Sequence, residues 1–444
     1  MKYKFGTDGI RGKANETLDA LTAFRIGKYL GYYFSQKEKQ TILVGKDTRR
    51  SGSMLEHAIA SGIAAGGCDA YLLGVGPTPA VAYLVRKDPF VCGVMISASH
   101  NPFYDNGIKL FSAGGTKMPR EVEERIEAYL EGSTEEIPYA TEGAIGEVID
   151  FPNGIEEYLQ WLRDTVNLDL TGMRILIDTA NGSATRTAHR LLSELGADVE
   201  WHHGKPDGLN INTNCGSTHT QDIRSRIVQG TYDIGFAFDG DADRLIAIAP
   251  DGQEINGDKI LYCCGKYMKQ QGILADDVVV TTVMANLGFF RKLDEEGMKY
   301  DVTQVGDKYV YESMSKNGYD IGGEQSGHII FRHHATTGDG LLTALKILEV
   351  MVKTGKSINE LTDDLFIYPQ LLVNVKVKDK EAMMNDPDVL AACQRVKDEL
   401  GNEGRVLVRP SGTEPLVRVM VEAKSDELCK HYVDMVCEVI QSKC

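Results

Sequence analysis

The chain has 444 residues, of which 42% are hydrophobic and 25% charged, which is typical of a globular protein and excludes disorder over most of the length. Its 48 basic and 64 acidic side chains give a net charge of −16, so the molecule as a whole has no attraction for nucleic acid or anionic lipid. No apolar stretch is as long as the roughly 18 residues of a membrane span. The nine cysteines form no metal-binding pattern and the first residues resemble no signal peptide, so we expect reduced thiols and a cytoplasmic location.

Strand and helix patterns alternate from the N-terminus. Apolar runs without in–out alternation predict buried strands over 41–45, 69–73 and 91–96, with a helix over 54–67 between the first two. Such runs favour a parallel sheet that is covered on both faces. The first 150 residues therefore read as an α/β domain.

The alternation of predicted strands and helices begins again twice, and a different pattern follows it. Strands are predicted over 173–178, 197–201 and 277–283, and helices over 184–195 and 286–296. Beyond Pro369, alternating strands over 371–377, 405–408 and 417–421 and an amphipathic helix over 426–441 indicate a small α+β unit. Turn-rich stretches between these patterns predict four domains, at 1–150, 151–252, 253–368 and 369–444.

The first candidate loop, Ser97 to Pro102, directly follows the predicted strand that ends at Ile96. Ligands of open α/β sheets bind beyond the carboxyl ends of strands, so a site is expected there. Ser99 has His100 beside it, and the following Asn-Pro forces a turn that could project the hydroxyl. On the motif alone, a serine that caps a turn is the favoured interpretation.

The second loop runs from Asp239 to Arg244, after an apolar predicted strand over 234–238. A cluster of carboxylates at alternate positions is costly unless a cation lies among them. An EF-hand is excluded, because it requires glycine where Arg244 stands. A nucleophilic carboxylate and a solvated acidic turn remain alternatives. The alternation favours coordination of Mg²⁺ by three aspartates, Asp239, Asp241 and Asp243.

The third loop, Gly322 to His328, has glycines on both sides of polar groups that can recognise hydroxyls. This mixture suits a sugar, and it also suits an ordinary polar turn. The fourth loop runs from Arg409 to Pro415, with Arg418 just beyond it. Its hydroxyls, glycine N–H and guanidiniums suit a phosphate dianion, although Arg409 could instead pair with Glu414 across a hairpin.

Together the loops describe a serine near a divalent metal, a sugar-binding loop and a phosphate clamp. In this order and over its whole length, the chain resembles the α-D-phosphohexomutase superfamily. The opening from Phe5 to Gly12 (FGTDGIRG) and the loop from Gly323 to His328 are similar to its phosphoglucosamine mutase branch. The resemblance implies three related mixed-sheet α/β modules and a smaller C-terminal α+β domain around a central cleft.

The resemblance also implies a reaction. α-D-Glucosamine 6-phosphate and α-D-glucosamine 1-phosphate would interconvert through a phosphoserine at Ser99 and a glucosamine 1,6-bisphosphate that serves as intermediate and activator, for UDP-N-acetylglucosamine and cell-wall precursors. One Mg²⁺ per site would be held by the Ser99 phosphate and the three aspartates. By the same resemblance, Glu324, Gln325 and Ser326 would bind the sugar, and the phosphate would be bound by Arg409, Ser411, Gly412, Thr413 and Arg418.

Proton transfer and partners follow from the resemblance as well. Lys109 and His328 are the implied acid and base, although Lys109 could be a surface lysine and His328 only a sugar ligand. His100, Arg11 and Arg244 would position the phosphoryl group. Lys308 stands where the branch has arginine, so a contact from it stays open. The implied partners are a small phosphosugar and a second copy in a homodimer, with neither nucleic acid nor membrane.

Three other functions remain open at this point. A phosphomannomutase or phosphoglucomutase of the same superfamily is disfavoured by Gln325 and by the opening residues. A non-catalytic phosphosugar-binding protein predicts loss of Ser99 or of an aspartate, and none of them is missing. A metal-dependent phosphatase requires water to reach the phosphoserine, which a sequence does not report.

Overall fold

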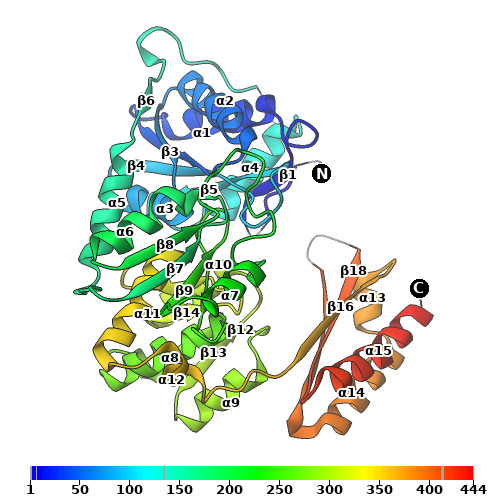
Figure 1. Cartoon of the computed structure of the whole chain (residues 1–444). Coiled ribbons are helices and arrows are strands. Elements are labelled where there is room, and N and C mark those ends of the chain that lie inside the picture. The colour runs from blue at the N-terminus through cyan, green and yellow to red at the C-terminus, as the bar shows by residue number, and fades with distance from the viewer. Residues whose placement is uncertain (1–2, 7, 134–135, 412–414, 444) are drawn as a thin grey trace. The chain divides into compact units, whose positions relative to one another are not determined.

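The computed structural model describes residues 3–6, 8–133, 136–411 and 415–443. The chain forms two compact units, which are Met1–Met284 with Met298–Thr362, and Ala285–Gly297 with Asp363–Cys444. Sheets flanked by helices make up both units (Figure 1). Within the described ranges, no helix is long and apolar enough to cross a membrane.

The first sheet has six strands in the order β1-β5-β4-β2-β3-β6, and it is mixed. Strand β2 lies parallel to β3 and β4, whereas β5 is antiparallel to β4 and β1. The carboxyl ends of β2 and β4 therefore meet at one edge, which is where ligands bind. The strands are β1 (Ile10–Lys13), β2 (Thr41–Lys46), β3 (Asp69–Val75), β4 (Phe90–Ile96), β5 (Asp105–Ser112) and β6 (Val148–Asp150). The helices are α1 (Ala20–Phe34), α2 (Arg50–Gly66), α3 (Thr78–Lys87) and α4 (Arg120–Leu130).

Helices α1 and α2 approach each other closely through glycines. A Cβ on Gly27 would lie 2.1 Å from the carbonyl oxygen of Ile59, and one on Gly62 would lie 2.1 Å from that of Phe24. No side chain fits at such a distance, so backbone packs directly against backbone. The remaining faces of the two helices bury Ile26, Leu30 and Ile63 in the core of this sheet.

The second sheet has the order β11-β10-β9-β7-β8, with β7 parallel to β8 and β9, and β10 antiparallel to β9 and β11. The segment from Asp239 to Arg244 is the connection between β9 and β10. The strands are β7 (Arg174–Asp178), β8 (Asp198–His202), β9 (Ile234–Phe238), β10 (Leu245–Ile248) and β11 (Glu254–Ile255). The helices are α5 (Asn153–Asp164), α6 (Ala188–Glu194) and α7 (Gln221–Ile227).

The third sheet has the order β13-β12-β14-β15, in which only β15 is antiparallel to its neighbour. The turn between β14 and β15 is the loop expected to bind a sugar. The strands are β12 (Val278–Thr282), β13 (Lys299–Thr303), β14 (Ile321–Gly323) and β15 (Ile329–Phe331). The helices are α8 (Gly257–Gln270), α10 (Asp307–Asn317), α11 (Gly340–Thr354) and α12 (Ile358–Thr362).

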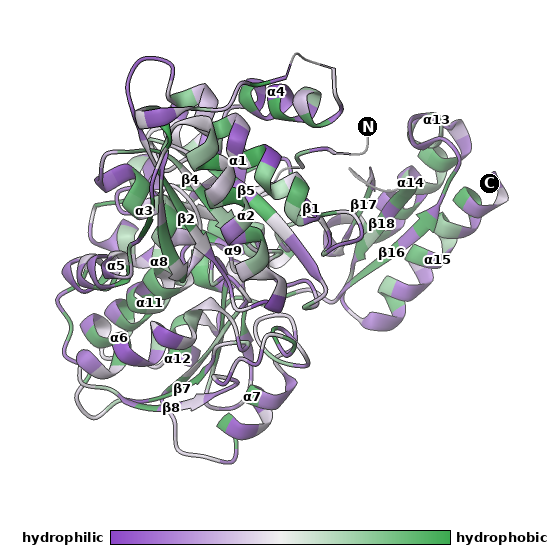
Figure 2. Cartoon of the chain, turned by 90° about the horizontal axis from the view of Figure 1, so that it is seen from above, coloured by the Kyte–Doolittle hydropathy of each residue, from purple (hydrophilic) through white to green (hydrophobic). Residues whose placement is uncertain are grey.

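The second unit is an antiparallel sheet in the order β16-β18-β17. In Figure 2, α14 and α15 carry both hydrophobic and hydrophilic residues, and they bury Val396, Val433 and Ile440 in the core of this unit. Its strands are β16 (Gln370–Lys376), β17 (Arg405–Pro410) and β18 (Leu416–Glu422). Its helices are α9 (Leu287–Glu295), α13 (Lys380–Met384), α14 (Pro387–Leu400) and α15 (Asp426–Ser442).

The expected fold class, α/β with mixed sheets and a smaller C-terminal α+β part, is confirmed. Two element boundaries differ by more than two residues. The helix predicted over 184–195 is a short 3₁₀ helix, Ser183–Arg186, followed by α6, and the Thr187 hydroxyl donates to the carbonyl of Ala184 at 3.3 Å at the break. Helix α2 begins at Arg50 rather than Met54, so its first turn contains Gly52 despite the low helix propensity of glycine.

Candidate active site

Ser99 lies in the loop between β4 and β5, buried and with a left-handed backbone (φ +52°), which is uncommon for a residue other than glycine. Its N–H donates to Ser97 Oγ at 3.0 Å, and its hydroxyl donates to Asp239 Oδ2 at 2.6 Å. The His100 Nδ1 atom is 3.4 Å from the same hydroxyl. The side chain of Ser99 is thus directed at the carboxylates of the β9–β10 connection.

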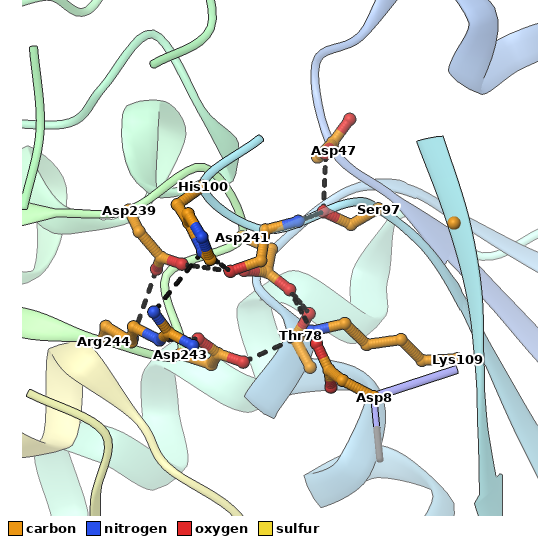
Figure 3. Close-up of polar contacts among 12 residues, drawn as sticks. Asp8, Asp47, Thr78, Ser97, His100, Lys109, Asp239, Asp241, Asp243 and Arg244 are labelled. Carbon is orange, nitrogen blue, oxygen red and sulfur yellow. Dashed lines mark hydrogen bonds and ion pairs between the residues drawn. The ribbon is translucent and has the colours of Figure 1, made fainter. Parts of the chain in front are cut away.

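The three aspartates of that connection form one buried cluster, which we call the metal loop (Asp239, Asp241 and Asp243). One oxygen of each lies within 4.8 Å of the others, and Asp241 is completely buried. A Cβ on Gly240 would lie 2.5 Å from the Ser99 carbonyl oxygen, so glycine permits the two loops to meet. Figure 3 shows the aspartates converging with Lys109 and Arg244.

The metal loop fits a divalent cation. The Oδ1 atoms of Asp241 and Asp243 are buried and have no hydrogen-bond partner among the residues that the structure describes. Carboxylate oxygens with open lone pairs are the ligands that Mg²⁺ prefers. Burial raises the pKa of Asp239 well above its usual value, and the neighbouring charges of Asp243 and Asp241 raise it further. A divalent cation would relieve this repulsion.

Lys109 supplies a fixed positive charge to the site. It lies on β5, is 3% exposed, and its Nζ is 2.8 Å from Asp241, 3.0 Å from Asp8 and 3.3 Å from Asp243. Burial alone would lower the pKa of Lys109, but these carboxylates more than offset it and raise the pKa well above the usual value. Lys109 is therefore not an ordinary surface lysine.

Three further side chains surround Ser99. The guanidinium NH1 of Arg244 is 3.4 Å from His100 Nδ1, and the Arg244 N–H donates to Asp239 Oδ1 at 3.2 Å. Arg11 forms an ion pair with Asp8 and lies 3.5 Å from the amide oxygen of Asn101. Burial, with the nearby charges of Arg244 and Arg11, lowers the pKa of His100 to about 4. His100 is therefore neutral at pH 7 and adds no charge to the site.

His328, at the end of the turn between β14 and β15, connects the third sheet to the same site. The N–H of Gly338 donates to His328 Nε2 at 2.8 Å, so the proton of the neutral ring lies on Nδ1, 3.8 Å from Asp243 Oδ2. Glu324 Oε1 accepts a hydrogen bond from Gly306 N–H at 3.0 Å. In the same loop, Gln325 is partly exposed and Ser326 is exposed.

The expected phosphate-binding residues belong to the second unit. Arg409 on β17 and Arg418 on β18 are direct cross-strand partners, so both guanidiniums lie on one face of the sheet. Two like charges in this position repel each other, and a phosphate dianion would offset that repulsion. Ser411 is buried, and its carbonyl accepts a hydrogen bond from Lys380 at 2.7 Å. Gly412 and Thr413 lie outside the described residues.

Several residues of the site have no role in the sequence analysis. Asp8 binds both Lys109 and Lys117, the latter at 3.2 Å. Thr78 binds Asp241 twice, through its hydroxyl at 2.5 Å and its N–H at 2.9 Å. Asp8 stands in the opening motif and could have been found there. Nothing local distinguishes Thr78, which lies far from the metal loop in sequence.

Comparisons with known proteins agree with this arrangement. Four models of the phosphoglucomutase/phosphomannomutase family match the chain, namely α/β/α domains I, II and III over residues 2–136, 156–252 and 256–367, and the C-terminal domain over 372–439. A phosphoglucosamine mutase of Lachnoclostridium phytofermentans is 51% identical, over 100% of this chain and 98% of its own length. One of Streptococcus sanguinis is 47% identical, over 100% and 99%. The chain belongs to the phosphoglucosamine mutase family.

Solved structures show the same fold at lower identity. A phosphoglucomutase/phosphomannomutase family protein of Burkholderia thailandensis superposes with a TM-score of 0.83 at 24% identity, covering 98% of this chain and 97% of its own. The N-acetylphosphoglucosamine mutase of Aspergillus fumigatus, solved with GlcNAc-6P and magnesium, has a TM-score of 0.68 at 17% identity, covering 98% and 96%. The resemblance seen in the sequence motifs is thus confirmed, for the family and for the phosphohexomutase fold.

Proposed function

We propose that the protein interconverts α-D-glucosamine 6-phosphate and α-D-glucosamine 1-phosphate, as a phosphoglucosamine mutase that carries its phosphoryl group on Ser99. The observation that carries the proposal is the hydrogen bond of 2.6 Å from the buried Ser99 hydroxyl to Asp239 in the metal loop. A hydroxyl in this position lies beside the carboxylates that would bind a divalent cation. The relatives at 47% and 51% identity support the choice of sugar.

One Mg²⁺ per site would be held by Asp239, Asp241, Asp243 and a phosphate oxygen on Ser99. When bound, Mg²⁺ supplies electrostatic stabilisation to the transferring phosphoryl group. His100, which is neutral and lies beside the Ser99 hydroxyl, and Arg244, which contacts His100, would orient that group. Arg11, which pairs with Asp8 and lies near Asn101, would help to hold it.

Each turnover comprises two phosphoryl transfers. In the first, a substrate hydroxyl oxygen bonds to the phosphorus on Ser99, the bond from phosphorus to Oγ breaks, and Oγ leaves with the electron pair. The hydroxyl proton passes to a protein base, and a proton returns to Oγ. Lys109 and His328 are the proposed proton carriers. The carboxylates beside Lys109 hold it protonated, so it could only donate a proton, which leaves the buried His328 as the proposed base.

The second transfer returns the other phosphate of the 1,6-bisphosphate to Ser99, after the sugar has turned over. This requires contacts that hold either orientation. We propose that Glu324, Gln325 and Ser326 bind the sugar hydroxyls. The non-reacting phosphate would be bound by residues of the C-terminal region, Arg409, Ser411, Gly412, Thr413 and Arg418. The residues given these roles come from all four proposed domains, 1–150, 151–252, 253–368 and 369–444.

The test is turnover with Mg²⁺ and a trace of 1,6-bisphosphate, with glucosamine 6-phosphate, glucose 1-phosphate and mannose 1-phosphate supplied in parallel at equal concentration. We expect kcat/KM to favour the glucosamine sugar strongly. The Ser99→Ala variant should lose nearly all turnover, while Ser61→Ala, an exposed serine on α2, should keep it. Equal or greater turnover of glucose or mannose phosphate would move the assignment to a phosphoglucomutase or phosphomannomutase.

The product would supply UDP-N-acetylglucosamine and cell-wall precursors in the cytoplasm, and the enzyme would act as a homodimer. Light scattering of the purified protein, with and without Mg²⁺, measures the oligomeric state directly. A monomer at micromolar concentration would contradict the homodimer and leave the proposed chemistry untouched.

A further inference from the structure

A buried guanidinium holds the backbone of the Ser99 loop. Arg49 follows β2 and is 2% exposed. Its NH2 donates at 2.8 Å to the carbonyl of Ser99 and at 2.8 Å to that of Asn101. Its NH1 donates at 3.1 Å to the carbonyl of Asp105 and also to that of Pro102. One side chain thus binds four carbonyls of a single short loop.

Asn212 binds two of the same carbonyls from a different part of the fold. Its Nδ2 donates to the carbonyl of Ser99 at 2.8 Å and to that of Asn101 at 3.1 Å. It lies in the segment after β8, beside the second sheet, and its own backbone is left-handed (φ +59°). The carbonyl of Ser99 therefore receives donors from both sheets that border the site.

The other side of the Ser99 peptide unit is held as well. The Arg49 Nε donates to Asp47 Oδ2 at 2.8 Å, and the same carboxylate accepts the Ser97 hydroxyl at 2.6 Å. Ser97 Oγ in turn accepts the N–H of Ser99. Both polar groups of the Ser99 backbone are fixed, at a residue whose left-handed conformation costs on the order of 1 kcal/mol or more. Strain of this kind persists only where the surroundings impose it.

We propose that Arg49 and Asn212, which we call the carbonyl clamp, are positioning residues of the phosphoryl transfer. They hold Ser99 in the left-handed conformation that directs its Oγ at the metal loop. This inference rests on the proposed function, because it concerns the serine that carries the phosphoryl group. The clamp touches no reacting atom, so its effect falls on the geometry of the transfer and not on the binding of the sugar.

Arginine is required at position 49 for a geometric reason. Its planar fork spreads five N–H donors over a wide arc, whereas lysine presents three from one point. A lysine there would keep the charge beside Asp47 but could not reach four carbonyls. Arg49→Lys therefore separates loss of positioning from loss of charge.

The experiment measures kcat, KM and thermal unfolding for Arg49→Lys, Arg49→Ala and Asn212→Ala. The matched control is Arg25→Ala, because Arg25 also donates to two carbonyls, those of Leu130 at 3.0 Å and Tyr129 at 2.5 Å, away from the site. We expect kcat to fall about 100-fold in the Arg49 variants, as for a reacting group displaced by about 1 Å, with KM within about threefold. Added guanidinium chloride at low millimolar concentration should restore part of the kcat of Arg49→Ala only.

Amide hydrogen exchange of peptides covering residues 97–105 gives a readout that does not depend on turnover. Exchange should be faster in all three clamp variants than in the parent, and unchanged in Arg25→Ala. If Arg49→Ala does not fold, the Asn212→Ala variant provides the test of the clamp, because it removes only one side-chain amide. If the parent protein shows no turnover, the proposed function is wrong. The exchange data would still test the clamp in that case.

Four results would overturn the proposal. The first is a folded Asn212→Ala or Arg49→Lys variant with a kcat within threefold of the parent. The second is a rise in KM that equals the fall in kcat. The third is exchange in 97–105 as slow as in the parent. A loss of kcat in Arg25→Ala as large as in the Arg49 variants would also overturn it, because it would show a general loss of stability.

Discussion

Asp241 is the most constrained carboxylate of the metal loop. Its Oδ2 is shared by Thr78 at 2.5 Å and Lys109 at 2.8 Å, while its Oδ1 is buried without a hydrogen-bond partner among the described residues. Thr78 and Lys109 hold the carboxylate in place, and the other oxygen keeps its lone pairs open. Such supporting contacts tune a metal site as strongly as the ligands themselves.

Replacing Asp241 with asparagine should weaken Mg²⁺ binding at least about tenfold, because it removes one charge from the metal loop. Calorimetric titration of Mg²⁺ into the unphosphorylated protein measures this directly. The control is Asp8→Asn, which removes a neighbour of Lys109 that lies outside the metal loop, and it should change the affinity less. Equal losses in the two variants would count against Asp241 as a ligand.

Asp339 predicts a pH dependence of stability. It caps α11 at its N-terminus, is completely buried and accepts the Tyr158 hydroxyl at 2.8 Å. Burial raises the pKa of Asp339 to about 6, from 3.8. The folded state therefore binds this proton more tightly than the unfolded state. Its stabilising contribution is full below pH 4 and is lost as the pH rises through 6, by about 3 kcal/mol in all.

The Asp339→Asn variant cannot titrate and should lack this dependence. Urea unfolding of metal-free protein between pH 4 and pH 7 measures it, as the difference in unfolding free energy between parent and variant. That difference should move in favour of the variant as the pH rises. A difference that stays constant over this range would show that Asp339 keeps its ordinary pKa in the folded protein.

The close contact of helices α1 and α2 reverses the usual effect of replacing a helical glycine with alanine. Alanine in place of a helical glycine usually stabilises a helix by up to about 1 kcal/mol. Gly62→Ala should instead destabilise the protein by about 2–4 kcal/mol, because its Cβ would lie 2.1 Å from the Phe24 carbonyl oxygen and force the helices apart. Gly143→Ala, where no atom lies within 4 Å, is the control and should be neutral. Chemical denaturation of both variants measures the difference.

The regular elements could be predicted because their signals are local. The apolar run over 91–96 and the amphipathic pattern over 426–441 correspond to β4 and α15 within a residue at each end. The start of α2 at Arg50 could not be predicted, because the low helix propensity of Gly52 obscures its first turn. The metal loop was predictable since its aspartates are neighbours in sequence. The contacts of Arg49 were not predictable, because they reach residues 50 to 56 positions away and no sequence motif marks them.

The two units contribute different charged groups. The first unit holds both carboxylates and cations in the region of Ser99, and the second unit pairs the guanidiniums of Arg409 and Arg418. On a strongly acidic chain, this pair of guanidiniums gives a local positive charge. Because the metal loop lies entirely within the first unit, changes in the second should leave metal binding alone.

Arg418→Ala tests this division of roles. We expect KM for the phosphosugar to rise at least about tenfold, because a charge-assisted contact to phosphate is lost, with Mg²⁺ affinity and thermal unfolding unchanged. Arg395→Ala removes an exposed arginine of α14 that pairs only with Glu399 in the described contacts, and it should alter none of these quantities. A normal KM in Arg418→Ala would exclude Arg418 from phosphate binding.

The carbonyl clamp has a consequence for how the loop can vary. Arg49 and Asn212 grip peptide oxygens, and every amino acid supplies one. The clamp therefore does not depend on side chains such as that of Tyr104, which is 48% exposed. Residues 103 and 104 can therefore be varied while the clamp keeps the course of the backbone, provided that Ser97, Ser99 and Asn101 are retained, because their side chains make contacts of their own. A loop that is held through its peptide oxygens accepts new side chains at such positions, which favours evolution, natural or directed.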